Sequence, residues 1–168
     1  LAAQLANAAP GATIRIPPGN YPGGLVANRA VHLVGTKGQV VIDGAGREGL
    51  AVRARGVTAQ DIQFSHSGTR ELPAVSVYEG ADLQLQDCEV QSNSAVALSA
   101  AGQSVVKARD SSFTARNGTA LRLTKSARGD FAQVSFSRRG DVPWPPPGPR
   151  AGLHSAPCRA DARPGCRP

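Results

Sequence analysis

Acidic residues recur at one equivalent position of a repeated sequence pattern. Asp61, Asp87 and Asp110 each stand just before a short apolar segment, and Gln133 takes this place in the following repeat. Stacked carboxylates supply the hard oxygen ligands that calcium prefers, and two neighbouring carboxyl groups supply the acid and base of glycoside chemistry. A short Asp side chain also bonds to nearby backbone and tolerates the backbone conformation of a bend. We favour this turn role and expect no cofactor, with Asp61, Asp87 and Asp110 as the candidate ligands if calcium binds.

A second candidate site is the outward face of another set of predicted strands. Alternation along these strands gives two outward rows, which are Arg53, Tyr78, Ser99 and Thr124, and Ala51, Ser76, Ala97 and Arg122. Glu79 and Lys125 lie just beyond the strand ends. One interpretation is a shallow groove for an anionic saccharide, and the other is an ordinary solvated sheet surface. The candidate ligand-binding residues are Arg53, Ser76, Tyr78, Glu79, Arg122 and Lys125.

These candidates lie in a sequence repeat that is clearest between Ala74 and Phe136. The lines PAVSVYEGADLQLQDCEVQSNS, AVALSAAGQSVVKARDSSFTARNG and TALRLTKSARGDFAQVSFSRRG each contain two alternating strands, a break and a third strand. A repeat of roughly 20 to 25 residues is typical of a stacked solenoid rather than of a domain with one central core. The predicted inward pairs of the first strands are Leu50 and Val52, Val75 and Val77, Val96 and Leu98, and Leu121 and Leu123.

The other two strands of each repeat carry four inward residues at offsets of two, three and two. The four groups are Val57, Ala59, Ile62, Phe64; Leu83, Leu85, Cys88, Val90; Val106, Ala108, Ser111, Phe113; and Gly129, Phe131, Val134, Phe136. Strict alternation predicts even offsets, so the step of three indicates a corner between the two strands. A chain that turns a corner in every repeat is expected to coil around an axis.

Residues 1–138 are predicted to form one domain of about six coils. Residues 1–9 are Ala-rich and are expected to form a short helix that covers the first coil, because solenoid ends need capping. Gly35 and Gly44 are expected at corners, where glycine adopts positive φ at little cost.

Residues 139–168 are rich in Pro and Arg, and we expect a disordered tail. Val142 and Trp144 suggest the hypothesis that the start of this tail folds over the last coil. Cys158 and Cys166 also lie in the tail, where they have only each other as disulfide partners.

The composition excludes several classes of protein. The 168 residues include only four Phe, two Tyr and one Trp, so a large aromatic core is not available. No apolar run is long enough to span a membrane. The net charge of +7 is not accompanied by a stripe of aromatic and basic residues, so we expect a solvated basic surface and no nucleic-acid partner. Cys88 falls in an inward column and is predicted to be buried.

The N-terminal run AAQLANAAPGATIRIPPGNYPGGLVANRAVHLVGTKGQVVIDG, followed by imperfect coils, resembles the start of a right-handed parallel β-helix of the pectin-lyase-like superfamily. Its most specific features are the Ala-rich helix, the TIRIPPGNY stretch and the VHLVG strand. The resemblance covers about residues 1–138. It implies an all-β right-handed parallel β-helix. In the enzymes of this superfamily, the sugar chain lies along the face that here carries Arg53 and Tyr78.

The motifs of those enzymes are missing from this sequence, so we assign no catalytic residues. No outward row holds several acidic residues, no Asp-Asp pair is present, and the epimerase signature D-P-H-D is absent. His32, His66 and His154 are far apart in the repeat pattern, and His32 is expected to point outward.

We therefore expect a non-catalytic binding or scaffold module that binds a polysaccharide or another protein and is part of a larger protein. One alternative is a partial or degenerate polysaccharide-active lyase or hydrolase, and another is a regulatory module fused to a bacterial signalling or secretion protein. A secreted or periplasmic location is favoured, and the oligomeric state is left open.

Overall fold

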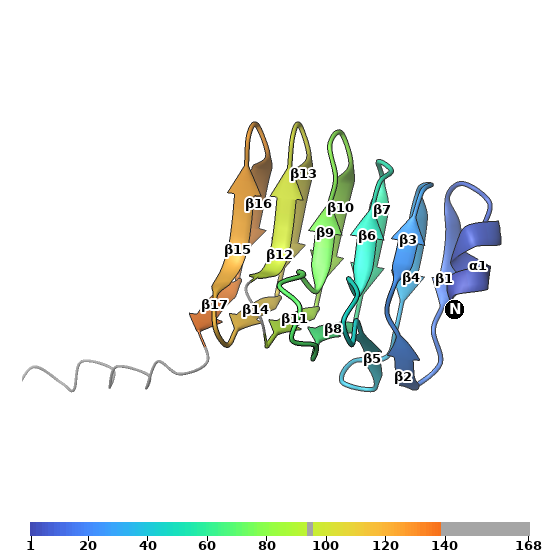
Figure 1. The fold of residues 1–168 in the computed structure, drawn as a ribbon. Helices are drawn as coiled ribbons and strands as arrows, with labels where there is room; N and C mark the ends of the chain where they lie inside the picture. Colours follow the sequence, from blue (N-terminus) through green and yellow to red (C-terminus); the bar gives the residue numbers. More distant parts are fainter. Residues whose placement is uncertain (94–95, 139–168) are drawn as a thin grey trace, which may run out of the picture.

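The computed structural model describes residues 1–93 and 96–138, and the sheets in this part of the chain consist of parallel strands. Figure 1 shows the strands stacked in chain order along one axis, with α1 (Ala2–Asn7) at the N-terminal end. Residues 139–168 lie outside the described residues, as do the hypotheses about Val142, Trp144, Cys158 and Cys166.

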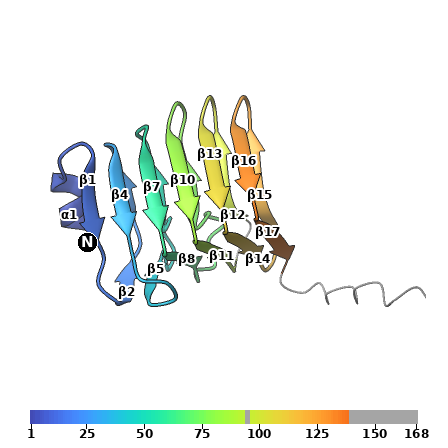
Figure 2. The same cartoon turned by 180° about the vertical axis from the view of Figure 1, so that it is seen from behind.

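The described strands belong to three sheets, and the chain visits the sheets in turn. Sheet A consists of β1 (Ala12–Arg15), β4 (Val31–Val34), β7 (Val57–Gln60), β10 (Asp82–Gln86), β13 (Val105–Arg109) and β16 (Arg128–Ala132). Sheet B consists of β2 (Gly19–Pro22), β5 (Val40–Asp43), β8 (Gln63–His66), β11 (Glu89–Ser92), β14 (Ser112–Ala115) and β17 (Ser135–Arg138). Sheet C consists of β3 (Leu25–Ala27), β6 (Leu50–Val52), β9 (Val75–Val77), β12 (Val96–Ala101) and β15 (Thr119–Thr124). Figure 2 shows sheet A from its outer side, and Figure 1 shows sheet C in front of it.

The core is a set of apolar columns that run along the axis between the sheets. In sheet A, Leu85 is paired in register with Ala59 on one side and with Ala108 on the other. In sheet B, Val90 is likewise paired with Phe64 and Phe113, and all three side chains are fully buried. The inward columns predicted for these two sheets are therefore confirmed, and the all-β parallel β-helix with a short N-terminal helix is confirmed with them.

The predicted corner between sheets A and B is present in each coil where the repeat shows it. Asp61, Asp87, Asp110 and Gln133 have φ values of 56°, 51°, 49° and 53°. Asp tolerates this left-handed conformation better than most residues, because its short polar side chain bonds locally. The geometry supports the turn role that the sequence favoured.

The predicted register of β12 was wrong. Leu98 and Ala100, rather than Val96 and Leu98, stand opposite Val75 and Val77. The outward rows change with it, because Ser99 now lies between Ser76 and Arg122, and Ala101 takes the place next to Thr124. The error arose because Val96, Leu98 and Ala100 all fit the inward alternation, so apolar character alone did not distinguish the two registers.

The two predicted corner glycines have a different role from the one expected. Gly35 and Gly44 are not among the residues with positive φ in the described part of the chain. A Cβ atom on Gly35 would lie 2.5 Å from the carbonyl oxygen of Asp61, and one on Gly44 would lie 2.1 Å from that of Arg47. Glycine is required here by the close approach of backbone segments rather than by φ.

The ends of the described stack differ. At the N-terminal end α1 lies against β3, and its Leu5 is only 5% exposed. At the other end Phe136 is 48% exposed and Leu123 38% exposed. The described residues thus cover the apolar columns at one end and leave them partly open at the other.

Candidate functional site

The corner between sheets A and B forms a groove that runs along the stack. The groove has a volume of about 850 Å³, and its lining includes Asp61, Asp87, Asp110 and Gln133. These residues occupy one column, because each follows its sheet A strand. The backbone N–H of each of the three Asp residues donates to the next coil, as that of Asp61 does to Gln86 O at 3.1 Å. The structure therefore brings the three candidate metal ligands into one groove.

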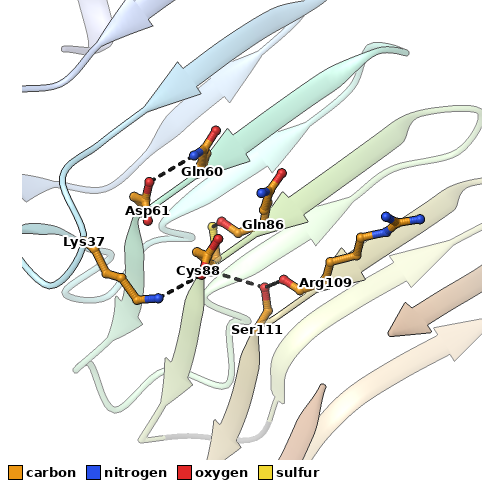
Figure 3. Close-up of polar contacts among 8 residues, drawn as sticks. Lys37, Gln60, Asp61, Gln86, Cys88, Arg109 and Ser111 are labelled. Atoms are coloured by element: carbon orange, nitrogen blue, oxygen red, sulfur yellow. Dashed lines mark hydrogen bonds and ion pairs between the residues drawn. The ribbon is translucent and has the colours of Figure 1, made fainter. Parts of the chain in front are cut away.

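A lysine neutralises part of this acidic column. Figure 3 shows Lys37 reaching across from its own loop, and Nζ donates to Asp87 Oδ1 at 2.8 Å. The hydrogen bond to Asp87, followed by its charge and those of Asp61 and Asp110, raises the pKa of Lys37 above its usual value. The column therefore attracts an ammonium group that the chain itself supplies.

Across residues 1–93 and 96–138, no three His, Cys, Asp or Glu side chains come together closely enough to hold a metal ion. Calcium needs six or more oxygen ligands, so Asp61, Asp87 and Asp110 would have to be supplemented from elsewhere. Calcium binding at this column stays a prediction.

On the outward face of sheet C, a carboxylate, a phenol and a guanidinium come together. Glu48 Oε1 accepts hydrogen bonds from Ser76 Oγ at 2.5 Å and from the Tyr78 hydroxyl at 3.1 Å. The Arg53 guanidinium lies over the Tyr78 ring, with Cζ 4.9 Å from the ring centroid. We call Glu48, Arg53, Ser76 and Tyr78 the sheet C cluster.

Burial and the neighbouring Glu48 carboxylate raise the pKa of the Tyr78 phenol, while Arg53 acts in the opposite direction. The phenol therefore remains a hydrogen-bond donor to Glu48 at neutral pH. Ser76 is only 6% exposed, whereas Tyr78 is 39% exposed. Ser76 thus serves to hold Glu48, whereas the Tyr78 ring is accessible to a ligand.

A compact loop between β5 and β6 places Glu48 beside the sheet. Asp43 Oδ1 accepts hydrogen bonds from the backbone N–H groups of Ala45 and Ser67, and Oδ2 accepts one from Ser67 Oγ at 2.7 Å. Partial burial would raise the pKa of Asp43, but these hydrogen bonds outweigh it and lower the pKa. The charged form of Asp43 therefore ties this loop to the following coil.

The other predicted ligand-binding residues are not part of the cluster. Glu79 follows Tyr78 in the turn after β9, and its side chain lies over Gly102 of the next coil. Arg122 is opposite Ser99 on β15, and β12 separates it from the strand of Ser76. Lys125 follows β15 with a φ of 59°. Of the six residues predicted, Arg53, Ser76 and Tyr78 are brought together.

Glu48 was missed because its segment does not belong to the repeat. The loop GAGRE breaks the alternation, and nothing in its spacing tells which sheet face an acidic residue there will approach. One available signal was its position immediately before Gly49 and Leu50, where the loop re-enters sheet C.

Cys88 was predicted to be buried and His32 to point outward, and both predictions are confirmed. Cys88 is 3% exposed, and burial raises the pKa of its thiol to about 11. His32 points outward from sheet A, and its Nδ1 lies 2.7 Å from Thr58 Oγ1. Neither belongs to the sheet C cluster.

Comparison with known proteins identifies the fold. No protein-family model matches the sequence, and no curated protein matches it. A solved structure of a pectin methylesterase mutant in complex with a hexasaccharide is similar, with a TM-score of 0.52 and 15% sequence identity. The match covers 84% of this chain and 62% of the esterase, so this chain spans less than two thirds of that protein's length. Within the described residues no helix has the length and apolar character needed to cross a membrane. The structural similarity to this esterase shows that the chain has a right-handed parallel β-helix fold, as its resemblance to the pectin-lyase-like superfamily implied.

Proposed function

We propose that the chain is a non-catalytic β-helix module that binds a saccharide chain on the outward face of sheet C. The observation that carries this proposal is the Tyr78 ring, which is exposed on a sheet face yet held in one orientation by Glu48 and Arg53. An aromatic ring presented rigidly to solvent loses little conformational freedom when a sugar ring packs against it.

Each member of the cluster has a separate part in this recognition. Arg53 covers one face of the Tyr78 ring, so a sugar packs against the other face. The Arg53 guanidinium also offers hydrogen bonds to hydroxyl or carboxylate oxygens. Glu48 is already an acceptor for Ser76 and Tyr78, which fixes its orientation and leaves further lone pairs for a sugar hydroxyl.

The similar pectin methylesterase is described in complex with a hexasaccharide, which supports a saccharide as the ligand class. A binding role is favoured over catalysis because Glu48 is the carboxylate in the sheet C cluster and is held by hydrogen bonds from Ser76 and Tyr78. Glycoside hydrolysis generally uses two carboxyl groups that flank the bond. The cluster supplies one of them.

The test is calorimetric titration of the chain with a galacturonate hexasaccharide, both as the free acid and fully methyl-esterified. Tyr78→Ala should weaken binding of the esterified form by about tenfold or more. Tyr78→Phe keeps the ring and loses only the bond to Glu48, so a loss of about two- to fivefold is expected. Tyr21→Phe is the matched control on another sheet and should leave binding unchanged.

Unaltered binding by Tyr78→Ala would refute the proposal. Turnover is followed in the same samples, with and without calcium, as release of reducing ends, unsaturated products or methanol. Turnover that is lost with Glu48→Gln would show that the chain is an enzyme rather than a non-catalytic binding module.

A further inference from the structure

The outward face of sheet A carries a second groove, on a different side of the molecule from the sheet C cluster. Its volume is about 470 Å³. The polar side chains that line it belong to β1, β4, β7, β10 and β13, and they are Thr13, His32, Thr58, Gln60, Gln84, Gln86, Lys107 and Arg109. Figure 2 shows these strands side by side. No acidic residue lines this groove within the described part of the chain.

Strand register arranges these side chains in two parallel rows. In one row Thr58 is paired with Gln84, which is paired with Lys107. In the other row Gln60, Gln86 and Arg109 occupy the equivalent places, and Figure 3 shows these three side chains projecting from successive strands. Consecutive side chains within a row are separated by the strand spacing of ~4.8 Å.

The rows change in character along the stack. On β7 and β10 they offer amides and a hydroxyl, which donate to and accept from sugar hydroxyls. On β13 they offer the two cations Lys107 and Arg109, both exposed, on one strand. A ligand that follows the groove therefore meets neutral hydrogen-bonding groups first and a pair of positive charges at the end.

We propose that this groove binds a linear saccharide that carries carboxylate groups, with the uronate carboxylate at Lys107 and Arg109 and the hydroxyls along the glutamine rows. Arg109 suits a carboxylate because its guanidinium donates two parallel hydrogen bonds. A nucleic acid is disfavoured, because single strands are held largely by stacking on aromatic rings and the lining of this groove holds no Phe, Tyr or Trp. This site does not depend on Tyr78.

One carboxylate opposes the proposed ligand. Asp130 of β16 is paired in register with Lys107, immediately beyond the groove. Its negative charge lowers the attraction of this end of the groove for an anion. Asp130→Asn is therefore expected to increase affinity for a carboxylated ligand about two- to threefold, although the substitution adds no contact.

The experiment uses the Tyr78→Ala chain as background, so that the contribution of the sheet C cluster is strongly reduced. Hexagalacturonate is titrated into this chain, into the same chain with Lys107→Gln and Arg109→Gln, and into the same chain with Arg70→Gln and Arg116→Gln. The first pair should lower affinity by about tenfold or more and reduce its dependence on salt. The second pair removes the same charge from outside the groove and should have little effect.

Equal losses from both pairs would overturn the site, because they would show attraction to net charge alone. Failure of hexagalacturonate to bind in the Tyr78→Ala background would also overturn it, whatever the outcome for the sheet C cluster. An increase in affinity with Asp130→Asn supports the site. Binding of a short oligothymidylate that is equally tight and equally sensitive to Lys107→Gln and Arg109→Gln would overturn the assignment to a saccharide.

Discussion

Phe113 and Phe136 are the same position of two successive coils, and they provide a direct test of the stacked core. They are paired in register on β14 and β17, and their rings are stacked with centroids 5.4 Å apart. Phe113 is fully buried, whereas Phe136 is 48% exposed at the open end of the described stack. Phe113 and Phe136 therefore have the same residue type and lie in the same column, and they differ only in whether a further described coil covers them.

Phe113→Ala removes a fully buried ring and leaves a cavity between two coils, which costs about 3 to 5 kcal/mol of the free energy of unfolding. Phe136→Ala costs about half of the value of burying a Phe side chain, roughly 1 kcal/mol, plus up to about 1 kcal/mol for the lost stacking on Phe113. No closed cavity forms at the open end. The expected difference between the two variants is about 1 to 4 kcal/mol.

The assay is urea unfolding followed by far-UV circular dichroism. Phe113→Leu serves as the control, because it keeps most of the volume and should cost less than about 1.5 kcal/mol. Equal losses for Phe113→Ala and Phe136→Ala would refute the reasoning, since they would show that the last described coil is covered in solution. A loss below about 1 kcal/mol for Phe113→Ala would show that the aromatic column does not stabilise the stack.

Three further predictions concern single residues. Asp110 has a φ of 49°, a conformation that glycine adopts easily and a β-branched residue does not. In urea unfolding, Asp110→Gly should change the free energy of unfolding by less than about 1 kcal/mol, whereas Asp110→Val should lower it by about 1 to 2 kcal/mol. A larger loss with Asp110→Gly would show that the carboxylate does more than form a turn. Since the thiol pKa of Cys88 is about 11, native protein at about pH 8 should resist iodoacetamide at this residue for hours, and mass spectrometry should find it alkylated only after unfolding. The pKa of Asp43 is lowered in the folded state, so the stability that its carboxylate contributes is complete above the unfolded pKa and is lost as the pH falls through the folded pKa. The melting temperature of the unaltered chain should therefore fall more steeply between about pH 5 and 2 than that of Asp43→Asn. Parallel curves for the two chains would contradict this role of Asp43.

The sequence predicted most of the coil, because burial imposes alternation on every strand. The step of three in each repeat located the corners at Asp61, Asp87 and Asp110. One residue at each corner forms the bend, so the inward-facing positions after it are shifted by one residue. The register of β12 could not be predicted in the same way. Val96, Leu98 and Ala100 form three successive apolar positions of one parity, and the choice among them is made by hydrogen bonding to β9 and β15.

The candidate sites were predicted less completely than the fold. Tyr78 and Arg53 were identified because outward positions follow from alternation once the inward residues are known. Glu48 required knowledge of a loop path that Asp43 and Ser67 determine through contacts across coils. The groove on sheet A was not found, because its glutamines and cations are ordinary surface residues until the register places them in two rows.

Coils of different length are brought into the same alignment in this molecule. The bonded pair His32 and Thr58 is 26 residues apart in the sequence, whereas Thr114 and Ser137 are 23 residues apart, and in both pairs the two residues lie on neighbouring strands. The additional residues of the longer coils lie in the loops between strands, so the pairing of the strands is unaffected. Natural variants of this protein are accordingly expected to tolerate insertions between strands, and to gain or lose length elsewhere by duplication or deletion of one complete turn. A single-residue insertion inside a strand would displace a whole row of outward side chains and would be selected against.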